Sequence, residues 1–309
     1  MKKKILVLGA NGLVGSSIIN FLSDKNFKIT GIYNNKNNRL INKKNVKYIK
    51  YNLKNLKSVK KIFHKKKFDI IFNSAAVLKS DNESFESMVK LYNDNVNIQK
   101  NLLSEAFKKN IGLFIYFSSI SIYEGIKKKK IKFDELHNYN LKSLYALSKI
   151  CGERLLETAT NSSNIHGVTL RLSGVHGIGR NNGVIYNMFN NAAKGKFIQI
   201  NEPKSVFRLT FVDDINRAVY LIIKKKLKKK YSVYNIAGKE IYNLKKLAKI
   251  IIGICKKGKL NLLKNSQTRY QVLNINKFKK EYNFKPLSLS KKLKKYKKYH
   301  QNINKLKVD

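Results

Sequence analysis

A glycine-rich turn directly after the first apolar run is the feature that most restricts how this chain can fold. Residues 5–8 form a continuous apolar run typical of a buried strand, and residues 13–23 follow with the periodicity of a helix. Gly9, Gly12 and Gly15 mark this junction. In such a unit the first glycine permits a tight turn, the second lets the backbone approach a pyrophosphate, and the third lets helix and strand pack closely. A purely structural turn is the alternative, but the position between a strand and a helix favours a phosphate-binding loop at a helix N-terminus.

Short apolar runs and helical patterns alternate through the first half of the chain. We expect strands at 5–8, 27–33, 46–51, 69–72, 111–117 and 168–172, and helices at 13–23, 56–66, 88–109 and 141–160. Strands joined in this way by helices need crossover connections, which produce a parallel sheet covered on both faces. The sequence therefore predicts an α/β fold in which residues 1–172 form a Rossmann-type, doubly wound, NAD(P)-binding domain.

After residue 172 the expected strands are shorter and their connections are longer. Strand-like segments at 197–200, 207–211 and 233–236 alternate with helical patterns near 213–226 and 244–255. We expect residues 173–309 to form mainly a smaller α/β lobe that binds the substrate, although some of its elements can return to the first sheet. The Lys-rich last twenty residues are expected to form a solvated helix with a frayed end.

The chain is strongly basic, with 65 Lys and Arg residues against 18 Asp and Glu and a formal net charge of +47. Lysine accounts for 58 of the basic residues; arginine, which bidentate recognition of bases and phosphates prefers, accounts for seven. Residues with GC-rich codons are scarce, which favours a compositional origin for the lysines over a specific nucleic-acid partner. The shortage of acids still favours a phosphate-bearing substrate.

The sequence predicts neither a membrane span nor a metal site. No stretch of about 18 uncharged apolar residues occurs, and the apolar run at 5–8 is too short for a signal peptide. Cys151 and Cys255 fit neither a metal-ligand spacing nor a disulfide framework. We therefore expect a cytoplasmic protein with reduced thiols.

A tyrosine and a lysine stand four residues apart in one of the expected helices. Tyr145 and Lys149 therefore share a helix face, where the ammonium can stabilise a phenolate. The same spacing recurs elsewhere in this Lys-rich chain, for example at Tyr220 and Lys224, so position must distinguish a functional pair. Ser119 follows the fifth expected strand, at the sheet edge where such folds bind ligands. Its hydroxyl can hold the oxygen that Tyr145 protonates or deprotonates.

The end of the second expected strand bears on the choice between NAD and NADP. An acid there would bind the ribose 2′-hydroxyl, whereas cations accept a 2′-phosphate. The sequence has Tyr33, Asn34 and Asn35, followed by Lys36 and Arg39. The missing acid favours NADP, but cations are common throughout this chain, so the cofactor is NAD or NADP.

Together these segments resemble the extended short-chain dehydrogenase/reductase superfamily, and within it the NAD-dependent epimerase/dehydratase family, with the UDP-glucose/galactose 4-epimerases most similar. The resemblance covers most of the chain. It is carried by the glycine motif, the Ser119 strand, the Tyr145–Lys149 pair and the segments at 73–76, 92–96, 170–177, 211–214 and 234–238.

The resemblance implies a nicotinamide cofactor, a nucleotide-sugar substrate, a homodimer and a set of site residues. Tyr145, Lys149 and Ser119 match the family's catalytic residues. The residues matched to cofactor binding are Gly9, Asn11, Gly12, Leu13, Val14, Gly15, Tyr33, Asn34, Asn52, Leu53, Ala75, Ala76 and Asn95, together with Tyr145 and Lys149. Those matched to substrate binding are Gly174, His176 and Arg208, together with Ser119.

The implied activity is NAD(P)-dependent epimerisation of a nucleotide-activated sugar, with C4 as the favoured carbon. Residues 119–121 lack the two acids that family dehydratases use, which argues against dehydration. Asn52, Gly174 and His176 replace residues common in the family and leave the sugar open. An NADPH-dependent reductase of a nucleotide-linked keto-sugar or another carbonyl is one alternative, and a catalytically silent NAD(P)-binding interaction protein is another.

For some charged residues the sequence supports a structural role as well as it supports a functional one. Arg208 fits a diphosphate clamp about as well as an ion pair with Asp213 or Asp214. The two aspartates suit the first turn of a helix, where they complement its dipole. Arg171 stands on an expected buried strand and suits an ion pair or a backbone contact.

Overall fold

The computed structural model describes residues 2–35, 39–64, 66–78, 84–109, 111–126, 130–263 and 268–305. The chain forms two compact units. Unit 1 comprises Met1–Lys127, Glu135–Leu172 and Val219–Asn235, and unit 2 comprises Lys128–Asp134, Ser173–Ala218 and Ile236–Asp309. The chain thus leaves unit 1 after Leu172, where the sequence pattern changes, and later returns to it.

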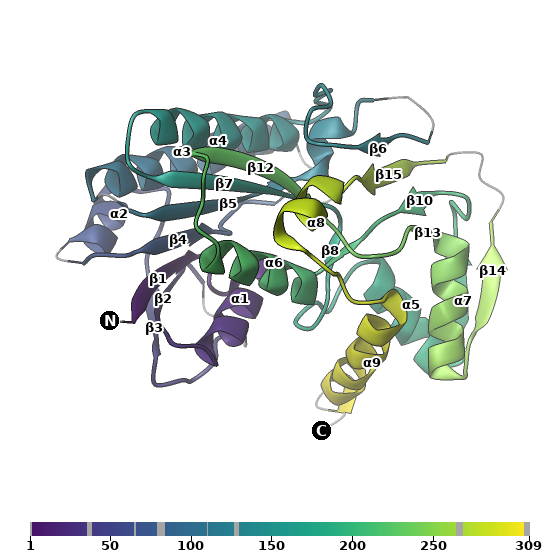
Figure 1. The fold of residues 1–309 in the computed structure, drawn as a ribbon. Coiled ribbons are helices and arrows are strands. Elements are labelled where there is room, and N and C mark those ends of the chain that lie inside the picture. The colour runs from purple at the N-terminus through teal and green to yellow at the C-terminus, as the bar shows by residue number, and fades with distance from the viewer. Residues whose placement is uncertain are drawn as a thin grey trace. The chain divides into compact units, whose positions relative to one another are not determined.

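Unit 1 is built on a parallel sheet. Within the described residues its seven strands lie in the order β12–β7–β5–β4–β1–β2–β3 (Figure 1). Their bounds are β1 Lys3–Leu8, β2 Phe27–Tyr33, β3 Val46–Lys50, β4 Ile70–Asn73, β5 Leu113–Ser119, β7 His166–Leu172 and β12 Tyr231–Ile236. Each neighbouring pair from β7 to β3 is parallel. The strand order reverses between β1 and β4, so this is the doubly wound α/β fold that the alternating pattern predicts.

Helices cover both faces of this sheet (Figure 1). Their bounds are α1 Leu13–Ser23, α2 Leu56–Phe63, α3 Phe85–Lys108, α4 Leu144–Asn161 and α6 Val212–Lys224. On one face α2, α3 and α4 pack through a core that includes Phe63, Leu102 and Leu156. On the other face the rings of Phe21 in α1 and Tyr220 in α6 meet edge to face, with their centroids 5.9 Å apart. Burial on both faces explains why the inner strands are continuous apolar runs.

One expected strand of the second half differs from the structure, and another joins the first sheet. Residues 207–211 are not one strand, because β10 (Val206–Phe207) and β11 (Thr210–Phe211) are separated and pair with different strands. The segment at 233–236 is a strand as expected; it belongs to β12 and is one of the elements that return to the edge of the first sheet. Local alternation does not show which sheet a strand joins, since the pairing partner is distant in sequence.

Unit 2 is a smaller α/β assembly of short strands and helices. Its remaining elements are β6 Lys132–Phe133, β8 Val175–His176, α5 Val184–Ala193, β9 Phe197–Ile200, β13 Tyr242–Asn243, α7 Leu244–Cys255, β14 Lys259–Leu262, β15 Tyr270–Leu273, α8 Asn276–Tyr282 and α9 Leu289–Lys305. Its core joins α5, α7 and α9. The expectation of a solvated C-terminal helix is wrong for one face of α9, where Leu293 and Tyr296 are buried and Lys292 pairs with buried Asp214.

None of the described helices is both long and apolar enough to cross a bilayer. The part of the chain that the structure describes also holds no group of three His, Cys, Asp or Glu side chains able to bind a metal ion.

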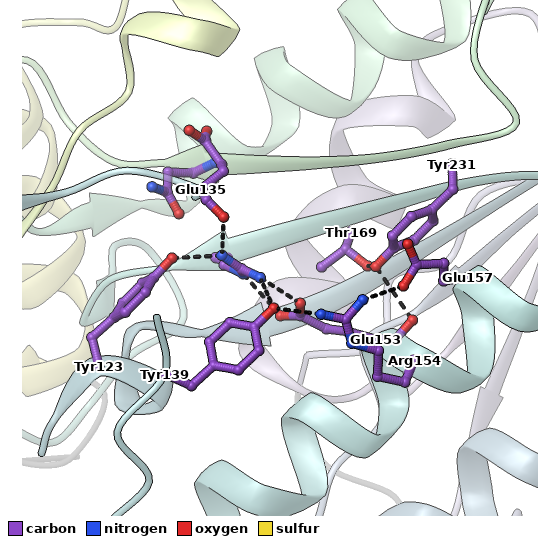
Figure 2. Close-up of polar contacts among 10 residues, drawn as sticks. Tyr123, Glu135, Tyr139, Glu153, Arg154, Glu157, Thr169 and Tyr231 are labelled. Atoms are coloured by element: carbon purple, nitrogen blue, oxygen red, sulfur yellow. Dashed lines mark hydrogen bonds and ion pairs between the residues drawn. The ribbon is translucent and has the colours of Figure 1, made fainter. Parts of the chain in front are cut away.

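A buried ion pair joins α4 to β7 (Figure 2). The side chains of Arg171 and Glu153 are 1% and 2% exposed, and two hydrogen bonds of 3.0 and 2.8 Å connect them. The guanidinium also donates to the hydroxyls of Tyr123 and Tyr139 and to the Glu135 carbonyl. These partners compensate the cost of burying the two charges. The structural interpretation of Arg171 is therefore confirmed.

We expect Glu153→Ala to destabilise unit 1 strongly, because it leaves the Arg171 guanidinium buried without its counter-charge. Losing one partner of a buried pair costs about 3–5 kcal/mol. The matched control is Glu157→Ala, one turn later in the same helix, which removes an exposed pair with Arg154 worth about 0–1 kcal/mol. Urea unfolding followed by circular dichroism compares the two variants. Equal losses of unfolding free energy would contradict this account.

Candidate functional site

The glycine turn makes close backbone contacts with the loop after β4. Gly9 has a φ of +77°, and a Cβ there would lie 2.8 Å from the Ala75 nitrogen. A Cβ on Gly15 would collide with the Gly9 carbonyl and with the Ser74 hydroxyl. The Gly9 amide donates to the Ile32 carbonyl, which ties the turn to β2. A side chain at either glycine would push α1 away from the sheet, which is the physical reason for these residues.

A crevice of about 210 Å³ lies at the carboxyl ends of the strands of unit 1, where the strand order reverses. The loops after β1, β2, β3 and β4 line it. The expected cofactor residues on its wall are Gly9, Asn11, Gly12, Tyr33, Asn34, Asn52, Leu53, Ala75 and Ala76. Sequence reasoning missed Ile32, Tyr51, Lys54, Ser74, Val77 and Ile98. All of these except Ile98 are next to an expected residue in the sequence, so extending each motif by one position would have found them.

The start of α1 fits a dinucleotide's phosphates. Gly12 caps the helix without a side-chain hydrogen bond, and the first turn contains no acid. The first amides of a helix lack partners within it and favour an anion. Leu13 and Val14 supply such amides, and Gly12 places no side chain in front of them. This donor set suits the diphosphate of a dinucleotide cofactor.

Asn95 braces a loop and is absent from the residues that line the crevice. Its side-chain oxygen accepts from the Val77 amide at 2.7 Å, and its nitrogen donates to the Val77 carbonyl at 3.0 Å and to the Ser148 hydroxyl at 3.3 Å. Asn95 therefore holds the loop after β4 against α4. A direct contact between Asn95 and a cofactor stays a prediction.

Arg39 lies beside the glycine turn. Its Nη1 donates to the Asn11 carbonyl at 3.2 Å, and the Asn11 side chain donates to the Asn35 carbonyl. Lys36, the other cation considered at this point, lies outside the described residues. Arg39, which follows β2 in the chain, is thus a cation in contact with the turn, and Tyr33 to Asn35 supply no acid.

Ser119 and Tyr145 are brought into contact by β5 and α4. Ser119 ends β5, and Tyr145 lies in the first turn of α4, where the Ser143 hydroxyl accepts from the Ala146 amide at 3.2 Å. The Ser119 hydroxyl lies close enough to the Tyr145 phenol to act on its pKa. Burial raises the pKa of Tyr145 to about 12; the Ser119 hydroxyl opposes this rise, and Glu124 adds to it. A phenol beside a second hydroxyl can exchange a proton with an alcohol or carbonyl oxygen placed between them.

Lys149 is a buried cation one helical turn from Tyr145. Its Nζ donates to the Phe117 carbonyl at 3.0 Å and lies 5.6 Å from the centroid of the Tyr145 ring and 5.2 Å from that of Tyr116. Burial lowers the pKa of Lys149 to about 8, and Glu153 opposes this change. The ammonium therefore stands where it favours ionisation of the neighbouring phenol.

Sequence reasoning did not identify Glu153 as part of these surroundings. Tyr145, Lys149 and Glu153 stand at intervals of four residues on α4 and share one face. That spacing is a signal that could have identified Glu153. It would not have shown that the pair with Arg171 holds the carboxylate in place.

The three expected substrate residues of the second half lie in unit 2. Gly174 is exposed, and its carbonyl accepts from the Thr210 amide at 3.3 Å. The buried ring of His176 contacts Tyr296 with centroids 4.5 Å apart, and burial together with Arg180 lowers its pKa to about 3. His176 is therefore neutral at physiological pH. Substrate binding by these residues stays a prediction.

Arg208 does not form the ion pair considered for it. Its guanidinium donates to the carbonyls of Gly238, Lys239 and Leu273 at 2.8, 3.1 and 3.1 Å. Asp213 and Asp214 lie in the first turn of α6 as expected, and they pair with lysines of α9. Three of the five N–H donors of Arg208 thus hold the surrounding loops.

Known proteins are similar to this chain in sequence and in fold. The N-acetyl-alpha-D-glucosaminyl-diphospho-ditrans,octacis-undecaprenol 4-epimerase of Escherichia coli O157:H7 is 28% identical over 183 residues, which are 57% of this chain and 53% of that protein. The chain matches about half the length of such curated relatives. The structure of UDP-glucose 4-epimerase from Thermotoga maritima with UDP-glucose gives a TM-score of 0.85 at 21% identity and covers 97% of this chain and 99% of that one. The structure of Thermus thermophilus UDP-glucose 4-epimerase in complex with NAD gives a TM-score of 0.82 at 19% identity. The match covers 96% of this chain and 99% of that one.

A family model matches most of the chain. The model of the NAD dependent epimerase/dehydratase family matches residues 5–237. This range includes the glycine turn, the crevice loops, Ser119, Tyr145 and Lys149. The chain therefore belongs to the NAD-dependent epimerase/dehydratase family of extended short-chain dehydrogenases/reductases.

Proposed function

We propose that this chain is an NAD(P)-dependent epimerase or oxidoreductase that acts on a nucleotide-activated sugar, with C4 as the reacting carbon. The observation that carries the proposal is the buried Lys149 ammonium, 5.6 Å from the centroid of the Tyr145 ring, with the Ser119 hydroxyl near the same phenol. All three side chains belong to unit 1, which also bears the glycine turn and the crevice. A silent binding protein would have no need for a buried cation next to a buried phenol.

The proposed chemistry divides proton transfer and positioning among these three side chains. Tyr145 accepts a proton from a sugar hydroxyl and returns it in the reverse direction. Lys149 stabilises the phenolate by its charge, and Ser119 donates a hydrogen bond that holds the reacting oxygen. A bound nicotinamide would supply the hydride acceptor for the sugar carbon. The missing acids at Ile120 and Ser121 support epimerisation rather than dehydration.

The crevice residues would hold the cofactor, which we propose to be NAD. The loops that carry Gly9, Tyr33, Asn52 and Ala75 would surround the adenosine, and the amides at the start of α1 would meet the diphosphate. The family is NAD-dependent by description, and the Thermus thermophilus structure is a complex with NAD. Arg39 already donates to the Asn11 carbonyl, which lessens its availability to a 2′-phosphate.

The substrate is proposed to be a sugar linked through a diphosphate to a nucleotide. UDP-glucose is bound in the Thermotoga maritima structure, and the Escherichia coli relative is named for a sugar diphosphate on a polyprenol. In both compounds a sugar is attached through a diphosphate, although the sugars differ. We propose that unit 1 binds the cofactor and that unit 2 supplies sugar and nucleotide contacts through Gly174, His176 and Arg208.

A homodimer through α3 and α4 is also proposed. A groove of about 590 Å³ between these helices is lined mainly by apolar atoms, including those of Leu103, Phe107 and Leu155. The Phe107 side chain is 44% exposed. A second copy that presents the same two helices would bury this surface in a symmetric four-helix interface.

We expect Tyr145→Phe to lower turnover by roughly 10²- to 10⁴-fold, because the variant cannot exchange the proton. Cofactor binding should persist, since the ring remains. The assay follows C4 inversion of UDP-linked hexoses. Tyr220→Phe is a matched control, because the Lys224 Nζ lies 5.6 Å from the Tyr220 ring, the distance found between Lys149 and Tyr145. An unchanged rate for Tyr145→Phe would refute the assignment.

We expect the purified protein to release NAD on denaturation, and Arg39→Ala to change the ratio of NADPH to NADH affinity by less than about threefold. A cation that binds a 2′-phosphate contributes about 1.5–3 kcal/mol, so its loss would weaken NADPH binding by roughly tenfold or more. Mass spectrometry identifies the released cofactor, and fluorescence titration measures both affinities. Selective loss of NADPH binding would instead support the reductase alternative.

We expect light scattering to give about twice the chain mass of 35.7 kDa for the parent protein. Leu155→Glu should convert it to a monomer, because the substitution puts a charge into the apolar groove. Phe197→Glu, at a half-exposed residue of β9, is the control that should stay dimeric. A monomeric parent protein would contradict this interface.

A further inference from the structure

We propose that the amino-terminal edge of the seven-stranded sheet is a binding site for a polyphosphate group of three or more linked phosphates. A cavity of about 550 Å³ opens at this edge in unit 1. Its lining residues are Lys2, Lys4, Lys28, Ile29, Thr30, Lys44, Asn45, Val46, Lys47, Lys66, Lys67 and Phe68. No other part of the proposed function uses this cavity.

The cavity is separate from the cofactor crevice because the strands are parallel. Its lysines stand before or at the starts of β1, β2, β3 and β4, whereas the glycine turn and the crevice follow the ends of those strands. Strands β1 and β2 have six and seven residues, which places the two edges about 20 Å apart. A ligand at one edge therefore leaves the other accessible.

Lysine is concentrated at this cavity beyond its share of the chain. Seven of the twelve lining residues are lysine, against 58 of 309 residues overall. The described lining contains no acid. The neighbouring acids are Asp24, which pairs with Lys43 at 3.2 Å, and Asp69, which accepts from the Lys4 backbone amide at 2.7 Å. A general lysine bias does not by itself gather seven cations around one hollow.

The ammonium groups of the seven lysines have no ion-pair partner among the described residues. Within the described residues none of them forms an ion pair or a side-chain hydrogen bond. Like charges around one cavity repel each other, and a bound polyanion would relieve that repulsion while gaining its own attraction to the lysines. The unliganded protein is therefore poised to bind such an anion.

The lining also indicates the class of ligand. Lysine binds phosphate as a point charge, without the planar fork with which arginine reads bases and carboxylates. The cavity volume lies in the range of small-ligand sites, which suits a short phosphate chain, free or attached to a nucleoside. Ile29, Val46 and Phe68 also line the cavity and supply apolar surface for a nucleoside attached to the phosphates.

The test measures tripolyphosphate binding to the full chain by isothermal titration calorimetry, with excess NAD present to occupy the crevice. We expect one site per chain that binds tripolyphosphate at least tenfold more tightly than orthophosphate. In the triple variant Lys28→Gln, Lys47→Gln, Lys67→Gln, the affinity should fall at least tenfold. The matched control is Lys245→Gln, Lys246→Gln, Lys249→Gln, which removes the same charge from exposed positions of α7 and should change the affinity less than twofold.

Several outcomes would overturn the proposal. Equal losses in the two triple variants would mean that binding follows the net charge rather than this cavity. Displacement of tripolyphosphate by NAD would assign the anion to the glycine turn. Tighter binding of a nucleic-acid duplex than of tripolyphosphate, lost in the same variant, would show that the edge is a nucleic-acid surface. Competition between a nucleoside triphosphate and tripolyphosphate for one site would support the proposal and identify the nucleoside-linked source.

Discussion

The close approach of the glycine turn to the loop after β4 is the constraint on which the rest of unit 1 depends. Gly9 and Gly15 leave no room for a Cβ against Ala75, Ser74 or each other. This contact fixes α1 at the point where the strand order reverses, and so directs the helix N-terminus into the crevice between β1 and β4. A larger residue would move the positive end of the helix dipole away from the position that a diphosphate would occupy.

The second half of the site depends on one face of α4. Tyr145, Lys149 and Glu153 follow each other at single-turn intervals, and β5 and β7 hold the two ends of this row through Ser119 and Arg171. A buried ammonium would ordinarily lose its proton, but the Phe117 carbonyl and the nearby carboxylate favour the charged form. The ion pair that stabilises the fold thus also shapes the electrostatics around the proposed base.

Local sequence patterns predicted the elements of unit 1 well, because strands and helices there have their own periodicity and the glycine turn has a strict geometry. The predicted helix at 13–23 has the bounds of α1. Contacts between segments that are distant in the sequence were harder to predict. Arg208 was expected to form an ion pair or to bind a diphosphate, and its guanidinium donates to the backbone carbonyls of Gly238, Lys239 and Leu273. No periodicity in the sequence encodes which carbonyls will lie within reach of a side chain.

The high lysine content of the chain also made two features difficult to predict from the sequence. Lysine is so frequent that neither the pair on α4 nor the buried face of α9 can be recognised from residue types. Tyr220 and Lys224 reproduce the spacing and the ring distance of Tyr145 and Lys149. What distinguishes the α4 pair is desolvation: Lys149 is buried against a carbonyl and a second ring, while Lys224 is exposed. A charge interacts strongly with a neighbouring phenol only where water does not screen it, so burial, rather than the motif, gives this pair its proposed chemistry.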